Sequence, residues 1–248
     1  MMGGPLGAIL GASLGNYFDS GFQRVLSDSS MAPGATERVQ SVFFTTTFSV
    51  MGYIAKADGR VSPSEIQLAE SVMAQMNLNS VQREVARNLF NEGKSADFPF
   101  HDVIAQFRRE CMRRQNLMQM FVEIVVATAL ADGSIASSEK QLLYVLSENL
   151  GFSRAEFESL LGRLGGQAGF QHPRDHVAKL KAAYKLLDIT PSSSDQELKK
   201  AYRRQMNQHH PDKLVAKGLP EEMMEIANQK TQQIKEAYDL VRQERESG

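Results

Sequence analysis

Two histidines, a proline and an aspartate stand side by side at His209–Asp212, directly after a run rich in lysine and arginine. Proline biases the residue before it, here His210, towards extended backbone, so a helix that reaches this point has to end. We therefore predict that these residues form a loop kept for contact rather than for packing. Adjacent histidines on a helix face different directions, and no other histidine is close in sequence, so a metal site at His209 and His210 is disfavoured.

The run before this tetrapeptide, DQELKKAYRRQMNQHH, has helical periodicity. Ser194 and Glu197 form a capping-box pair at its start. One face is an apolar stripe of Leu198, Ala201, Tyr202 and Met206. The other face carries four cations: Lys199, Lys200, Arg203 and Arg204. A returning helix offers Ile226, Ile234, Ala237, Tyr238 and Val241 to the first one, so we expect a small antiparallel helical hairpin.

The order of a short helix (AAYKLLDI), the basic helix ending in HHPDK and a helix containing IKEAYDLV resembles a J domain over 182–242. J domains dock onto DnaK-type ATPase chaperones. The resemblance implies a docking surface made of the four cations above with His210, Pro211, Asp212 and Lys213. In the family, the aspartate engages an arginine of the chaperone, while the basic helix meets an acidic ATPase lobe. Within this resemblance, Gln205 replaces a usually apolar residue and Asp188 replaces a common glycine.

Such a chain is not itself an enzyme: it has no nucleotide loop, needs no cofactor and activates the ATPase of its partner. Two other interpretations of the basic face are weaker. The face could be merely solvated, or it could contact nucleic acid as in a helix-turn-helix. The loop of a dozen residues after His210 is far longer than the three or four residues usual there, which argues against nucleic acid.

The bulk composition narrows the classes of function further. The 248 residues are 42% hydrophobic and 23% charged with a net charge of −1, so any charged interface has to be a local patch. A single cysteine, Cys111, excludes an internal disulfide and a cysteine-rich metal cluster, and its helical surroundings indicate an ordinary packing residue. No alternating strand pattern appears, so the predicted fold class is all-α.

Two long apolar runs, residues 42–59 and 120–133, each end in Ala-Asp-Gly, and their length and glycine stop favour buried helices over strands. The segments AKADGRVSPSE (Ala55–Glu65) and ALADGSIASSE (Ala129–Glu139) repeat each other. We therefore expect a pseudo-duplicated helical bundle with the two apolar helices at its centre. The repeat is similar to the TerB family of tellurite-resistance proteins over residues 39–164.

The repeat carries four acidic residues that could offer oxygen ligands to a divalent cation: Asp58, Glu65, Asp132 and Glu139. Acidic loops of the TerB family have been linked to metal binding. The alternative function is therefore a metal-binding stress-response protein in which the J domain only recruits a chaperone. The structural interpretation is favoured, because Ser62, Pro63 and Glu65 read as a capping box, and we assign no metal. In the second copy Ala136 takes the N-cap position, which leaves Glu139 less explained.

The first eighteen residues carry no charged side chain. Glycine recurs every four residues, which places one face of a helix in the small-xxx-small pattern of paired membrane helices: Gly3, Gly7, Gly11 and Gly15. The run is slightly shorter than the roughly 20 residues of a span, and it lacks the basic region and cleavage site of a signal peptide. We predict a single-pass membrane anchor at 1–18 with a dimerisation face, in preference to a flexible glycine-rich tail.

Residues 165–181 are rich in glycine and are predicted to form a flexible linker between the TerB-like domain at 39–164 and the J domain at 182–248. This arrangement behind a glycine-patterned N-terminus resembles the DjlA-type membrane-anchored co-chaperones. The resemblance implies a protein of the bacterial inner membrane whose two domains face the cytoplasm, where it recruits a DnaK-type chaperone to the membrane.

Overall fold

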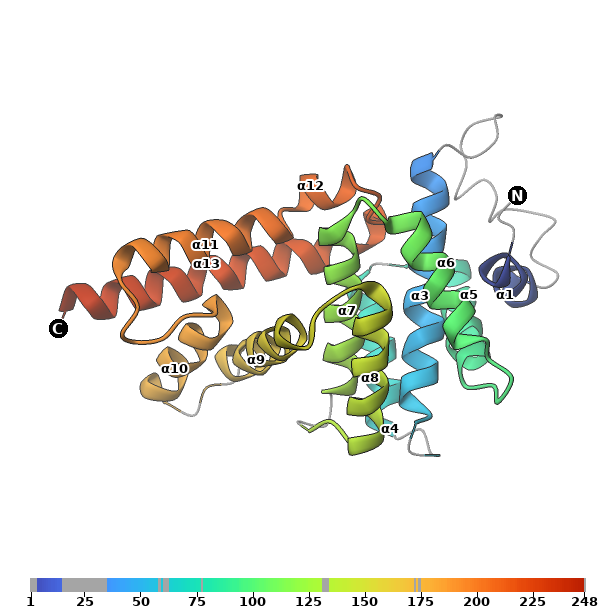
Figure 1. Cartoon of the computed structure of the whole chain (residues 1–248), viewed down its shortest axis with the longest axis horizontal. Coiled ribbons are helices and arrows are strands. Elements are labelled where there is room, and N and C mark those ends of the chain that lie inside the picture. Colours follow the sequence, from blue (N-terminus) through green and yellow to red (C-terminus); the bar gives the residue numbers. More distant parts are fainter. Residues whose placement is uncertain are drawn as a thin grey trace. The chain divides into compact units, whose positions relative to one another are not determined.

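The computed structural model describes residues 4–14, 35–57, 59, 63–76, 78–130, 134–171, 173 and 175–247. These residues form helices and turns and contain no β-strand, which confirms the all-α prediction. They divide into two compact units (Figure 1). Unit 1 comprises Met1–Phe152 with Val215–Met224, and unit 2 comprises Ser153–Leu214 with Glu225–Gly248. The division at Phe152 comes before the predicted end of the TerB-like domain at Leu164.

Unit 1 is built around one apolar helix. Its helices are α1 (Pro5–Leu14), α3 (Ala35–Ala55), α4 (Pro63–Gln75), α5 (Ser80–Gly93), α6 (Phe100–Cys111), α7 (Gln115–Ala129) and α8 (Ser137–Leu150). Every residue from 41 to 52 of α3 is buried, because α3 contacts all the other helices of the unit. Phe43 of α3 packs with Phe107 and Phe121, whose ring centroids are 4.5 Å apart. These rings form the centre of the core.

The internal repeat corresponds to two helix pairs, α3–α4 and α7–α8. The apolar helices α3 and α7 contact each other, and each also contacts the second helix of the other copy. Tight packing of α3 on α5 depends on two glycines. A Cβ at Gly52 would lie 2.0 Å from the Phe90 carbonyl oxygen, and one at Gly93 would lie 1.8 Å from the Ser49 carbonyl oxygen. Only glycine lets these two helices approach so closely.

Helix α1 packs on α3, α5 and α6. Leu6 and Ile9 are buried there, and the Leu6 N–H donates to Gln106 Oε1 at 3.1 Å. None of the helices in the described part of the chain has both the length and the apolar character needed to cross a bilayer. Of the predicted dimerisation face, Gly7 and Gly11 lie in α1, whereas Gly3 and Gly15 lie outside the described residues.

The segment predicted as a flexible linker is largely helical. Helix α9 (Arg154–Gln171) runs through its first half, and α10 (His176–Leu187) begins before its end. One of its glycines serves close packing: a Cβ at Gly166 would lie 2.7 Å from the Leu186 backbone nitrogen, whereas a Cβ at Gly165 would meet nothing within 4 Å. Asp175 starts α10 as an N-cap that accepts from the Ala178 N–H at 2.7 Å. At Gly166 the glycine therefore marks a helix contact, which local composition does not distinguish from flexibility.

The remaining helices are α11 (Asp195–His209), α12 (Pro211–Val215), a 3₁₀ turn η2 (Glu221–Met223) and α13 (Met224–Ser247). The core of unit 2 joins α9, α10, α11 and α13 through Phe170, Leu187, Leu198, Ile234 and Val241. Helices α11 and α13 lie side by side as the predicted hairpin (Figure 1).

Candidate functional site

The basic helix α11 begins at the predicted capping box. The Ser194 hydroxyl accepts from the Glu197 N–H at 3.3 Å, and the Glu197 carboxylate accepts from the Ser194 N–H at 2.7 Å. Because the backbone N–H and hydroxyl of Ser194 donate to the charged carboxylate, the pKa of Glu197 lies below its usual value. The box satisfies amides that the first turn of a helix leaves without partners.

The predicted apolar stripe holds α11 on its neighbours. Leu198 and Ala201 are buried, and the Tyr202 ring stacks on Tyr238 of α13 with centroids 4.4 Å apart. Met206 packs against the same core at the edge. The opposite face of α11, which carries the cations, is therefore turned to solvent.

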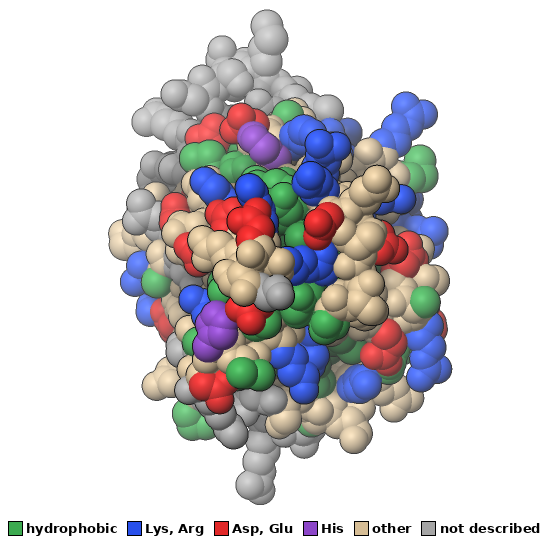
Figure 2. All heavy atoms as spheres, turned by 90° about the vertical axis from the view of Figure 1, so that its left-hand side faces the viewer, with side chains coloured by type: hydrophobic (Ala, Val, Ile, Leu, Met, Phe, Trp, Pro, Cys, Tyr) green, Lys and Arg blue, Asp and Glu red, His purple; other side chains and the backbone are tan. Residues whose placement is uncertain are grey.

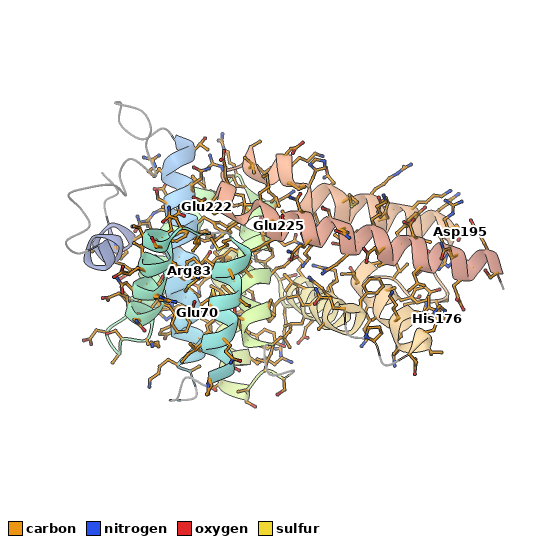
Figure 3. All side chains as sticks on the ribbon, turned by 180° about the vertical axis from the view of Figure 1, so that it is seen from behind. Glu70, Arg83, His176, Asp195, Glu222 and Glu225 are labelled. Carbon is orange, nitrogen blue, oxygen red and sulfur yellow. The ribbon has the colours of Figure 1, made fainter. Side chains whose placement is uncertain are left out.

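Ion pairs fix the end of the hairpin where α11 begins. Asp195 accepts from Arg245 of α13 at 2.8 Å, and His176 of α10 lies 3.0 Å from Glu244 (Figure 3). These contacts join α13 to α10 and to the start of α11. The His-Pro-Asp triplet lies at the other end of α11.

Helix α11 ends at His209, as the proline predicts, and His210 has extended backbone with φ −60° and ψ 123°. The next residues are not the predicted loop. Pro211 instead opens the short helix α12, whose Leu214 N–H donates to the His210 carbonyl at 3.0 Å. Proline breaks the helix behind it but is favoured as a first helical residue, since its fixed φ is helical and its missing N–H is not needed there. His210 therefore lies between the two helices, and Pro211 and Asp212 form the first turn of α12.

The two adjacent histidines lie in different environments. His209 is 2% exposed, and its Nδ1 lies 2.9 Å from the Gln205 carbonyl oxygen, so it serves the fold. The His210 side chain is 45% exposed and the Asp212 side chain 87% exposed, with 4.0 Å between Nδ1 and Oδ2. A pair of histidines divided in this way does not chelate one metal ion, whereas His210 and Asp212 present one polar tip.

The cations around the tip differ in what they contact. Lys199, Lys200 and Arg203 are exposed. Arg204 donates to Asp188 at 3.1 Å, and Lys213 donates to Asn207 of α11. Positive side chains are interspersed with negative ones on the face drawn in Figure 2. The cations of α11 that are open to a partner are therefore Lys199, Lys200 and Arg203.

Both departures from the J-domain pattern have structural consequences. Asp188 is the C-cap of α10 with φ +60°, the left-handed conformation for which glycine is common, and its carboxylate also lies 3.6 Å from Arg163. Gln205 is 2% exposed, and its Nε2 has no hydrogen-bond partner among the described residues. The sequence marked both positions but could not supply their contacts.

Of the four acidic residues of the repeat, the structure describes the side chain of Glu139 alone, and among the described residues no group of three or more histidine, cysteine or acidic side chains could hold an ion. Glu139 is buried and accepts from the Ala136 N–H at 2.8 Å, which is half of a capping box and accounts for its position. Asp58, Asp132 and the Glu65 side chain lie outside the described residues. Cys111 is buried, and burial raises its pKa to about 12, as suits a packing residue.

Comparison with known proteins identifies both parts of the chain. Residues 45–161 match the family described as tellurite resistance protein TerB, and residues 182–246 match the DnaJ domain. The fold and the exposed His-Pro-Asp turn thus belong to the class of proteins that carry a J domain.

Curated relatives define the family more closely. The chain is 43% identical to the co-chaperone protein DjlA of Photobacterium profundum, an alignment that covers 99% of this chain and 95% of the relative. It is 41% identical to the protein of that name from Escherichia coli K12, over 99% and 93%, and 40% identical to that from Haemophilus influenzae, over 97% and 92%. No solved structure matches the chain. The chain belongs to the DjlA family of co-chaperones.

Proposed function

We propose that this chain docks through α11 and the His-Pro-Asp turn on a DnaK-type chaperone and stimulates its ATPase. The observation that carries the proposal is the Asp212 carboxylate, 87% exposed beside His210 at the start of α12. Pro211 restricts the backbone there, so little conformational entropy is lost on docking. A carboxylate held in this way is suited to a charge-assisted hydrogen bond with an arginine of the chaperone.

The exposed cations of α11 steer the encounter. Lys199, Lys200 and Arg203 lie on one helix that leads to the tip, and they attract an acidic surface from a distance. The tip then fixes how the two proteins align, because it carries the Asp212 carboxylate that pairs with the arginine of the chaperone. Hydrolysis is carried out by the chaperone, and this chain supplies the contact that triggers it. Lys213 and Arg204 complete the proposed surface at its edges.

Single-turnover ATP hydrolysis by a purified DnaK-type chaperone tests the docking step. We expect His210→Gln and Asp212→Asn to remove at least about nine-tenths of the stimulation, because a buried charge-assisted contact contributes 2 kcal/mol or more, roughly thirtyfold. Asp239→Asn is the matched control: it removes one exposed carboxylate of the same hairpin from α13. Full stimulation by the Asp212→Asn protein would falsify the docking mechanism.

The domain division and the membrane location complete the proposal. An N-terminal anchor at 1–18, a TerB-like domain at 39–164, a connecting segment at 165–181 and a J domain at 182–248 would bring the chaperone to the bacterial inner membrane, on its cytoplasmic side. Support comes from the uncharged N-terminal run and its glycine spacing. Insertion requires α1 to leave its contacts with α3, α5 and α6, where Leu6 and Ile9 are buried. The same spacing supports a homodimer through Gly3, Gly7, Gly11 and Gly15.

Alkaline carbonate extraction tests the anchor. The full chain should stay with the membrane pellet, and a chain beginning at residue 35 should be released. Release of both proteins contradicts insertion. For the dimer, Gly7→Ile and Gly11→Ile should lower crosslinking of the membrane-bound chain, with Ala8→Ile as a control of equal bulk on another face. Equal crosslinking of all three variants would contradict a dimer contact through the glycines.

A further inference from the structure

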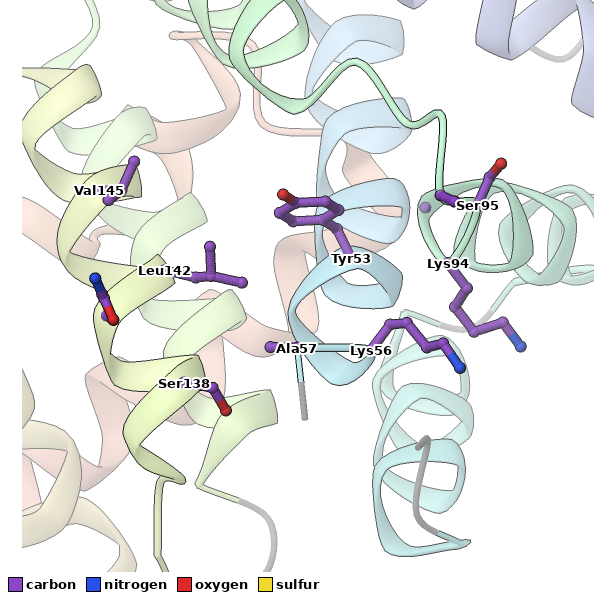
Figure 4. Close-up of a pocket in the computed structure, with 11 residues that line it drawn as sticks. Tyr53, Lys56, Ala57, Lys94, Ser95, Ser138, Leu142 and Val145 are labelled. Atoms are coloured by element: carbon purple, nitrogen blue, oxygen red, sulfur yellow. The ribbon is translucent and has the colours of Figure 1, made fainter. Parts of the chain in front are cut away.

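Unit 1 contains a cavity of about 590 Å³ that the proposed docking site does not use. It lies between the end of α3, the turn after α5 and the first half of α8 (Figure 4). Its volume falls within the range of about 300–1,000 Å³ of sites for small molecules. The residues used in the argument are Tyr53, Lys56, Lys94, Ser138, Gln141 and Leu142.

One wall of the cavity carries polar groups with no internal use. The Tyr53 ring is held by stacking on Phe100, with centroids 4.6 Å apart and planes 14° apart, and its hydroxyl points towards α8 (Figure 4). From α8, Ser138 and Gln141 face the same space. Within the described residues none of these three side chains makes a hydrogen bond. A rigid ring and three open polar groups form a prepared surface for a ligand.

The charged side chains among the described residues of the lining are both lysines. Lys56 and Lys94 contribute their ammonium groups. Lys56 Nζ donates to the Gly59 carbonyl at 2.7 Å, and Lys94 Nζ lies 5.3 Å from the centroid of the Phe90 ring. Two lysines on one side of a cavity attract a negatively charged group.

Helix α8 contributes hydrogen-bonding and apolar groups to the cavity. Ser138 lies in its first turn, where the Glu139 carboxylate accepts from the Ala136 N–H at 2.8 Å. Further along the same helix, Leu142 and Val145 give the wall an apolar stretch. The cavity thus combines a cationic, hydrogen-bonding part with an apolar part.

We propose that this cavity binds a small amphipathic anion, a molecule with a carboxylate or phosphate group on an apolar body. The two lysines attract the anionic group, and the hydroxyls of Tyr53 and Ser138 lie apart from them on the side of α8, where they meet other parts of the ligand (Figure 4). The apolar body lies against Leu142. A compact volume of this size suits one small molecule better than an extended chain. The site is independent of the His-Pro-Asp turn.

Naphthalene probes test this site on the full chain, because the chain has no tryptophan to interfere with their fluorescence. 2-Naphthoate and 2-naphthyl phosphate offer the two kinds of anionic group, and 2-naphthol is their neutral counterpart at pH 7. We expect one of the anions to bind with a dissociation constant on the order of 0.1–1 mM, by the usual efficiency of small ligands. Which anion binds tighter identifies the preferred group. Inorganic phosphate alone should bind more weakly than either.

Two variants localise the binding. The double variant Lys56→Gln with Lys94→Gln should weaken binding of the anion about tenfold, the effect expected for two partly exposed charge contacts. Lys140→Gln is the matched control, since it removes the same charge from α8 at a residue outside the lining. Val145→Phe should reduce binding by filling the cavity while both lysines remain. Thermal unfolding of each variant verifies that the fold persists.

The proposal is overturned by any of three results. If neither anion binds at 10 mM, the cavity is not a site for an amphipathic anion. If 2-naphthol binds with the same affinity as the anions, charge does not contribute to binding. Binding that survives both the lysine pair and the filling variant places the probes elsewhere. Chaperone stimulation is a separate measurement, so failure here leaves the docking mechanism unaffected.

Discussion

The Asp188 carboxylate accepts a hydrogen bond from Arg204, with 3.1 Å between Oδ2 and Nη2. Asp188 ends α10 and Arg204 lies on α11, so the pair joins two helices of unit 2. The pair also gives two neighbouring arginines of α11, Arg203 and Arg204, different surroundings. Arg204 is held by a carboxylate that it shares with Arg163, whereas Arg203 is exposed and forms no ion pair with a described carboxylate.

This difference in surroundings predicts unequal effects of the same substitution. Arg203→Gln should lower the apparent affinity for the DnaK-type chaperone about three- to fivefold, the effect of losing one exposed steering charge. Arg204→Gln should change it less than twofold, because that charge is already occupied by Asp188. Titration of chaperone ATPase stimulation at low salt gives both values. A larger loss at Arg204 than at Arg203 would show that the Asp188 contact opens when the partner binds.

The two histidines should separate stability from function. His209→Ala removes a buried ring and its contact with the Gln205 carbonyl, so unit 2 should lose about 2 kcal/mol of unfolding free energy. His210→Ala should change stability by less than about 0.5 kcal/mol, since its ring is partly exposed. Hydrogen exchange of the α11 and α13 amides measures both. Equal protection in the two variants would contradict this assignment.

The contrast between these neighbours indicates how far the sequence alone could lead. The proline predicted where α11 ends, the Ser194–Glu197 pair predicted where it begins, and the apolar stripe predicted which face is buried, because each is a local rule of helix geometry. The sequence did not predict that α12 starts at Pro211, since proline ends one helix and begins another equally well. The glycines of residues 165–181 also led to a prediction of flexibility where the chain is largely helical. At Gly166 the deciding fact is a backbone from another helix, which no local pattern contains.

Acid should weaken the start of α11. The folded-state pKa of Glu197 is lowered by its hydrogen bonds with Ser194, so its stabilisation is complete above the unfolded-state pKa and is lost as the pH falls through the folded value. Glu197→Gln keeps an acceptor without a titrating charge. At pH 7 the wild-type amides of the first turn should exchange more slowly than those of the variant, and the difference should disappear once the pH lies below the folded-state pKa. A difference that does not decrease as the pH is lowered would exclude the carboxylate as its source.

Gln205 offers a gain in stability. Its Nε2 is buried without a partner, and a buried unsatisfied donor costs about 1–3 kcal/mol. Gln205→Leu should therefore raise the unfolding free energy of unit 2 by about 1 kcal/mol, with the backbone contact from Gln205 to His209 retained. Chemical denaturation, together with hydrogen exchange of the α11 amides, measures the change in unfolding free energy. Loss of protection in the leucine variant would mean that the amide has a role in the packing.

Unit 1 should tolerate glycine substitutions unequally. A Cβ at Gly93 would overlap the Ser49 carbonyl oxygen at 1.8 Å, so Gly93→Ala has to push α5 away from α3 along their contact. We expect a loss of about 3 kcal/mol, at the upper end of overpacking effects, because the obstacle is backbone and cannot rotate aside. The thermal unfolding midpoint and the protection of the α3 amides against hydrogen exchange should both fall.

Gly162 is the matched control within a helix. A Cβ there meets nothing within 4 Å, so Gly162→Ala should stabilise α9 by about 0.5–1 kcal/mol through the lower entropy of its unfolded chain. The same chemical change thus has opposite signs at two helical positions, and only the neighbouring helix differs. If Gly93→Ala were as harmless as Gly162→Ala, α3 and α5 would not be in the close contact that defines the centre of unit 1, and the burial of residues 41–52 would need another explanation.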